Sequence, residues 1–236
     1  MDIKKFLQEG SDHFLQNLSI DLVIMGYDGN ALKCLLLKIG EKWLLPGGYI
    51  GKHESVDHAT NRILMERTGI QDPYFKFLSV FGNHDRSFAS DFKQFFKGRG
   101  MKWKDEYFIN NRFVTLAYYS FVDINEFELQ AGEFIESIEW FDFDSIPDMW
   151  LDHQSIVLHA RDRIKEDLKY QMTSYKLLPE EFTMPQLHQL HQVILEEKLD
   201  RSRFQKNMLS SGMFERLPML KKNSPGRNPY LYKLKS

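Results

Sequence analysis

The sequence of 236 residues contains one cysteine, Cys34, and has no apolar run near the roughly 18 residues that a membrane span requires. A lone cysteine excludes an intrachain disulfide, and its apolar surroundings indicate a buried structural thiol. The first ten residues mix charges and lack the continuous apolar stretch of a signal peptide. We therefore expect a cytoplasmic protein with no membrane segment. An apolar share of 42% favours a folded core over disorder.

Charge is unevenly distributed, although the net charge is only −2. Residues 201–236 hold nine basic residues and one acidic residue, whereas residues 1–200 hold 22 basic and 32 acidic ones. A compact basic end on an acidic body is typical of a protein that binds a polyanion. The alternative is a solvated basic tail, and the folding signals in this segment argue against it.

The first 150 residues combine strand patterns with one clear helix pattern. Ser55 as N-cap and Gly69 as terminator predict a helix that ends near Thr68. A second, long helix is expected over about residues 153–170. Apolar runs predict strands over residues 19–27, 32–39, 75–81, 113–122 and 138–141.

A long connection over residues 87–111 is rich in aromatic side chains. Loops of this length in compact domains are lids or contact surfaces, or else disordered, and we favour a lid or contact surface. Its aromatic residues are Phe88, Phe92, Phe95, Phe96, Trp103, Tyr107 and Phe108.

Six residues between the second and third predicted strands follow the pattern G-x5-E-x7-R-x3-E-x2-G-U, where U is aliphatic. They are Gly48, Glu54, Arg62, Glu66, Gly69 and Ile70. The pattern resembles the signature of the Nudix family over its whole length of 23 residues. The resemblance implies an α/β/α sandwich over about residues 15–150.

The helix of this box departs from the family pattern at two positions. In the family it reads Arg-Glu-U-x-Glu-Glu, and the glutamates hold a divalent metal that activates water for attack on a diphosphate. Here Ile63 and Arg67 replace two glutamates, and only Glu66 remains. Isoleucine cannot bind metal, and Arg67 places a cation where Mg²⁺ would have to lie. We therefore predict no catalytic residue, no metal site and no cofactor.

A box of this kind can still hold a small molecule without cleaving it. Arginines suit an anionic ligand and carboxylates suit sugar hydroxyls, although each charge could equally form a structural salt bridge. Two further residues follow the strand at 75–81 and could project into the same cleft. The predicted effector-binding residues are Gly48, Tyr49, Glu54, Arg62, Glu66, Arg67, Asp85 and Arg86.

Residues 176–236 carry two capped helices joined by a short turn, the pattern of a helix-turn-helix. Thr183 and Gln186 form a capping box with Pro185 between them, and Asp200 is the second N-cap. His188 and His191 share a helix face, but the absence of an adjacent carboxylate or cysteine argues against a metal site.

One side of the second helix offers cationic and amide donors without an acidic residue, as a major-groove reader requires. A solvated face is the alternative, but such faces usually mix signs. Beyond it, strands at 214–220 and 230–234 flank a basic Pro/Gly loop, which predicts a wing that contacts phosphates or the minor groove. The predicted DNA-binding residues are Arg201, Arg203, Lys206, Asn207, Lys221, Lys222 and Arg227.

Together these features resemble the Nudix-related transcriptional regulators, which include the NrtR type that senses ADP-ribose and the AraR type that senses arabinose. The resemblance also rests on Leu-Leu-Pro-Glu-Glu-Phe-Thr at 177–183, Leu199-Asp200-Arg201 and Gly226-Arg227. It implies an α+β chain: a Nudix-like sensor over 1–150, a connecting helix over 151–175 and a winged-helix domain over 176–236. It further implies a homodimer on a palindromic double-stranded DNA operator, released by a sugar or ADP-ribose-like effector, of which we favour the sugar.

Two other functions fit parts of the sequence. An active Nudix hydrolase of a nucleoside diphosphate derivative, with an appended nucleic-acid-binding domain, would need another acidic residue to rebuild a metal site with Glu54 and Glu66. An RNA-binding accessory factor is disfavoured because the basic helix lacks exposed aromatic residues for base stacking.

Overall fold

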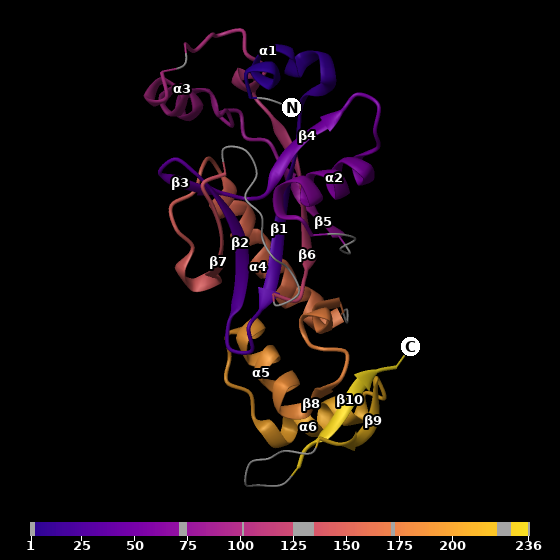
Figure 1. Ribbon diagram of the computed structural model, residues 1–236. Helices are drawn as coiled ribbons and strands as arrows, with labels where there is room; N and C mark the ends of the chain where they lie inside the picture. The colour runs from indigo at the N-terminus through magenta and orange to yellow at the C-terminus, as the bar shows by residue number, and fades with distance from the viewer. Residues whose placement is uncertain are drawn as a thin grey trace.

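The computed structural model describes residues 3–70, 75–100, 102–124, 135–170, 173–220 and 228–235. Figure 1 shows an elongated molecule with a large sheet-based body and a smaller head that carries the C-terminus. The sandwich followed by a winged helix confirms the predicted fold class. Within the described ranges, no helix has the length and apolar character needed to cross a membrane.

The body is built on one mixed sheet of seven strands. Central strand β1 (Phe14–Tyr27) pairs in parallel with β6 (Val114–Phe121) and antiparallel with β2 (Leu32–Ile39) and β4 (Gly47–Gly51). The remaining strands are β3 (Lys42–Leu44), β5 (Phe75–Phe81) and β7 (Ser137–Asp142). All five strands predicted from the apolar runs are present, and β3 and β4 are too short to show a pattern.

Alternate residues of β1 face two separate cores. Ile20 and Leu22 pack beneath α2 (Val56–Thr68), whereas Val23 and Met25 belong to the core beneath α4 (His153–Tyr170). Because side chains alternate across a strand, burial of both faces produces the continuous apolar run of the sequence. Cys34 is fully buried in the α4 core, which confirms the expected burial.

Both ends of α2 lie where the sequence predicts them. The Ser55 hydroxyl accepts a hydrogen bond from the His58 N–H at 3.1 Å, and Gly69 ends the helix with a φ of 76°. Gly48 faces this helix so closely that a β-carbon would lie 2.9 Å from Cγ1 of Ile63. Gly48 therefore allows the loop to pack on the helix, and Ile63 is a core residue.

The 87–111 connection contains two elements that the sequence did not reveal, α3 (Ala89–Gly98) and the short 3₁₀ helix η1 (Phe108–Asn110). They pack with α1 (Ile3–His13) at the end of the body remote from the head (Figure 1). Phe88, Phe96 and Tyr107 are buried in this third cluster. Most of the aromatic side chains thus pack in a local core, and a lid or contact role of this connection stays a prediction.

The head consists of a three-stranded sheet and two helices. The sheet order is β8 (Phe182–Thr183), β10 (Tyr230–Leu234) and β9 (Phe214–Met219), and the helices are α5 (Met184–Leu195) and α6 (Arg201–Ser210). The predicted capping box is present, because Thr183 N–H donates to Gln186 Oε1 at 2.8 Å and Gln186 N–H donates to Thr183 Oγ1. Short 3₁₀ helices η2 (Phe143–Ser145) and η3 (Thr173–Leu177) flank α4 in the sequence.

A buried histidine lies at the centre of the head. The Nε2 atom of His191 lies 3.2 Å from the hydroxyl of Tyr175, and its ring packs edge-on against Phe204. Burial lowers the pKa of His191 to about 4, so the ring is neutral at pH 7.

This lowered pKa predicts acid sensitivity of the head. The unfolded chain protonates His191 near pH 6.5 and the folded chain only near pH 4, so stability falls as the pH drops between these values. The free energy of unfolding should decrease by about 2 kcal/mol from this residue between pH 7 and pH 5. In urea denaturation, His191→Phe should lose this part of the pH dependence, whereas exposed His53→Gln should retain it. If the free energy of unfolding of His191→Phe depended on pH as steeply as that of the wild type, the assignment of this pH dependence to His191 would be contradicted.

Candidate functional site

Arg62 of α2 holds both carboxylates that remain in the box. Its guanidinium donates to the two oxygens of Glu54 at 2.6 and 3.0 Å and to Oε2 of Glu66 at 3.0 Å. A further bond at 2.9 Å reaches the carbonyl of Tyr49. The bonds from Arg62 hold the pKa of Glu54 below its ordinary value, against the opposing effect of burial. This network closes the loop between β4 and α2.

These residues do not fit a divalent metal of the Nudix type. Oε1 of Glu54 also accepts the N–H of Gly51 at 2.6 Å, so its two oxygens are occupied by protein donors. Ile63 is buried under Gly48, and Arg67 contributes a positive charge. Mg²⁺ needs several free oxygen ligands, which this arrangement does not offer.

Arg67 is a half-buried cation in the same box. Its Nε donates to the carbonyl of Gly47 at 3.1 Å, and within the described ranges it forms no ion pair. Burial lowers the pKa of the guanidinium, while attraction from Glu66 opposes this shift. A desolvated arginine with donors remaining beyond Nε is suited to bind a phosphate or carboxylate in two-pronged geometry.

Tyr49 connects this cation to an aromatic cluster. Burial and the charge of Asp21 raise the pKa of its hydroxyl above the ordinary value, and Arg67 and Arg86 act in the opposite direction. The phenol is therefore neutral and sits among charges of both signs. The rings around it are Phe6, Phe14, Phe108 and Phe113, with centroids 5.0 to 5.8 Å away.

Arg86 occupies a different environment from Arg67. Its side chain is 1% exposed and forms ion pairs with Asp21 at 2.7 Å and Asp152 at 2.9 Å. His153, at the start of α4, accepts the N–H of Leu45 through Nδ1 at 3.0 Å and faces Asp21 with Nε2 at 3.7 Å. This cluster joins β1, the turn before β4, the segment after β5 and the beginning of α4.

The structure separates the predicted effector residues into two groups. Gly48, Tyr49, Glu54, Arg62, Glu66 and Arg67 lie together on β4, the loop that follows and α2. Arg86 is enclosed with its two carboxylates, and Asp85 is exposed. No sequence pattern indicated Asp21, Asp152 and His153, because their partners are distant along the chain.

The exposed face of α6 carries the predicted reading residues. Phe204 is buried and Met208 is half-buried, which directs the other side of the helix to solvent. Arg201, Arg203, Lys206 and Asn207 are exposed, and the cations among them form no ion pair with the described residues. Lys221, Lys222 and Arg227 lie outside the described residues.

Side chains of α5 hold the turn that leads into α6. Gln192 Oε1 accepts the N–H of Leu199 at 3.0 Å, and His188 Nε2 lies 2.9 Å from the carbonyl of the same residue. The two helices and their turn thus form one rigid unit. The two histidines that share a face of α5 contact protein groups, His188 at Leu199 and His191 at Tyr175.

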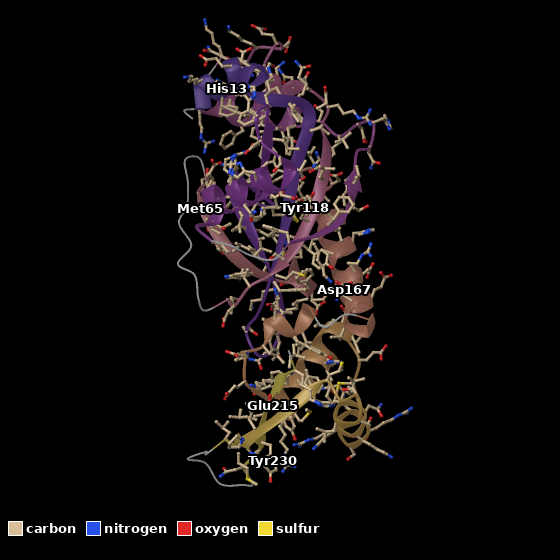
Figure 2. The ribbon with its side chains drawn as sticks, turned by 90° about the vertical axis from the view of Figure 1, so that its right-hand side faces the viewer. His13, Met65, Tyr118, Asp167, Glu215 and Tyr230 are labelled. Atoms are coloured by element: carbon tan, nitrogen blue, oxygen red, sulfur yellow. The ribbon has the colours of Figure 1, made fainter. Side chains whose placement is uncertain are left out.

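The wing strands contain a cationic residue that the sequence analysis did not select. The guanidinium carbon of Arg216 lies 3.3 Å from the centroid of the Tyr230 ring. Figure 2 shows Glu215 and Tyr230 on these strands, at the opposite end of the molecule from His13. A stacked arginine at the base of the wing adds to the positive charge of the head.

Two protein families match this chain. The NUDIX domain matches residues 17–160, and the NrtR DNA-binding winged helix domain matches residues 174–234.

Similar proteins have the same two parts. The ADPR responsive transcriptional repressor NtrR of Acinetobacter baylyi is 25% identical over 214 residues, which cover 87% of this chain and 77% of the relative. The crystal structure of Shewanella oneidensis NrtR matches with 24% identity and a TM-score of 0.71, and its complex with a 27mer DNA matches with 25% identity and a TM-score of 0.70. Each alignment covers 93% of this chain and 94% of the matched chain. The chain thus belongs to the Nudix family, in the form that carries an NrtR-type winged helix at its C-terminal end.

Proposed function

We propose that this protein is a transcriptional repressor that binds a double-stranded DNA operator as a homodimer in the cytoplasm and is released by an ADP-ribose-like effector. The observation that carries the proposal is the cationic face of α6 on a winged helix, whose cations form no ion pair with the described residues. Its exposed donors suit phosphates and base edges in the major groove. We assign base reading to Arg203, Lys206 and Asn207, and phosphate contacts to Arg201, Lys221, Lys222 and Arg227.

The effector part of the proposal rests on Arg67. A half-buried cation without an ion-pair partner among the described residues suits the diphosphate of ADP-ribose, and the adjacent aromatic cluster includes Tyr49. The sequence favoured a simple sugar, but the relative named as ADPR responsive favours ADP-ribose. Glu54, Arg62 and Glu66 shape the loop through their mutual ion pairs. We assign Arg86 an indirect role, through its ion pair with Asp21, because both charges act on the Tyr49 hydroxyl.

The alternative of an active Nudix hydrolase has less support. It would require both carboxylates to leave Arg62 and a metal to bind beside Arg67. We therefore assign no catalytic residue and infer binding without cleavage.

Removal of the proposed anion contact should weaken effector binding. Arg67→Ala should raise the Kd for ADP-ribose about 10- to 100-fold, because charge-assisted hydrogen bonds contribute roughly 1.5–3 kcal/mol. Isothermal titration in the presence of EDTA should measure binding by the wild type, since no metal is needed. Lys52→Ala, which removes an exposed cation from the same loop, should bind like the wild type. Equal affinity of Arg67→Ala and wild type would refute this contact.

Incubation of the protein with ADP-ribose and Mg²⁺ should leave the diphosphate intact. The box lacks free carboxylates to position a metal-bound water. The release of AMP, measured by chromatography, should not exceed that of a protein-free sample. Magnesium-dependent release that Glu66→Gln abolishes would establish the hydrolase instead.

Two arginines within one turn of α6 should differ in their effect on DNA binding. Arg203→Ala should cost about 1–3 kcal/mol at one operator position and relax specificity there, because it removes a base contact. Arg201→Ala should weaken binding to operator and to random duplex alike. The number of counterions released on binding, measured from the salt dependence of the affinity, should fall by about one. Gel retardation on an operator selected from random sequence measures both. Base reading by Arg203 is excluded if Arg203→Ala loses affinity equally for the operator and for random duplex.

A further inference from the structure

A set of ion pairs joins the body to the head where α4 meets the end of α5. The carboxylate of Glu196 accepts from Nε of Arg161 and from Nζ of Lys165, the latter at 2.8 Å. Arg161 also donates to Asp144 of the body at 2.6 Å. The side chains of Arg161 and Lys165 are 21% and 27% exposed and that of Glu196 is 39% exposed, so the contact is shielded from water mainly on the α4 side. Figure 2 shows Asp167, on the same helix, at the end of the body that adjoins the head.

The backbone conformation of Glu196 is unfavourable for a glutamate, so capping of α5 does not by itself explain this residue. It caps α5 with a φ of 59° and a ψ of 32°, in the left-handed region. Glycine or asparagine is preferred at such a position because a side chain with a β-carbon is strained there. A glutamate that tolerates this strain indicates a role for its carboxylate.

Glu196 links α4, which packs into the body, to the turn that leads into α6. On one side, α4 is immobilised in the body through Ile156, Val157 and Ile164, which are fully buried. On the other side, the residues after Glu196 lead into the turn that α5 holds through Leu199. Apolar contacts also continue from body to head, but they are non-directional, whereas two charged hydrogen bonds to one carboxylate define an orientation.

We propose that Glu196 is a positioning residue for operator recognition: by pairing with Arg161 and Lys165 it fixes α6 relative to the body. In a dimer, this orientation sets the distance between the two reading helices, and hence the spacing of half-sites that both can contact. The inference rests on the proposed function, because it presumes two heads on one operator.

The test compares Glu196→Gly with Glu197→Gln in the full-length chain. Glu196→Gly relieves the left-handed strain and removes the carboxylate. If Glu196 served only to cap α5, this variant would be at least as stable as the wild type and would bind DNA normally. Glu197→Gln removes the same charge from the adjacent exposed position, which forms no ion pair with the described residues. Binding is measured on the selected operator, on versions with two base pairs inserted between the half-sites, and on random duplex.

Wild type and Glu197→Gln should lose about tenfold in affinity when the spacing is changed, whereas Glu196→Gly should lose less than about threefold. Random duplex should be bound alike by all three, because the cations of α6 are unchanged. The inference is overturned if Glu196→Gly keeps the spacing preference of the wild type. It is also overturned if Glu196→Gly loses affinity equally for every duplex.

A measurement without DNA separates this inference from the proposed function. Spin labels at Lys52→Cys and Ser202→Cys report the distance between body and head, and Cys34 is too buried to take a label. Glu196→Gly should broaden the distance distribution relative to Glu197→Gln. A distribution as narrow as that of the control would refute positioning by Glu196. Failure of the wild type to retard any duplex would instead refute the proposed function.

Discussion

The pairing of Arg62 with Glu54 and Glu66 is the constraint on which the character of this Nudix domain depends. One guanidinium engages both remaining carboxylates of the box, and the same residue binds the carbonyl of Tyr49. The loop is therefore held on α2 by protein contacts alone and needs no metal to close it. Arg67 then lies beside a loop that is already in place, and it forms no ion pair with the part of the chain that the structure describes. A box organised in this way favours ligand binding over hydrolysis.

The local features of the fold were predictable from the sequence because their causes are local. Ser55 and Gly69 determine the ends of α2 within one turn of themselves, and Thr183 with Gln186 does the same for α5. α1 was not predictable in this way. Its contact with the body depends on residues such as Phe108, which lie about a hundred positions further along the chain.

The candidate site was predictable only as a set of charges, since their partners decide what they do. Arg67 and Arg86 look equivalent in the sequence. In the structure Arg86 is enclosed by Asp21 and Asp152, which lie 65 and 66 residues away, whereas among the described residues Arg67 is hydrogen-bonded to a backbone carbonyl and to no carboxylate. Burial of an arginine between two carboxylates makes it a structural element, because separating it from them would leave uncompensated charges. The same guanidinium without a carboxylate remains available to a ligand.

The charge asymmetry of the chain bears on how two anionic partners are kept apart. Residues 1–175, which include the body, hold 20 basic against 27 acidic residues, so the body repels anions. Screening limits this repulsion to about 8–10 Å at physiological salt, and the head lies at one end of the elongated molecule (Figure 1). In the proposed function, DNA would therefore approach the basic head with little opposition. Under the proposed function, an anionic effector must enter the acidic body, and there a desolvated cation such as Arg67 would offset the repulsion where solvent screening is weakest.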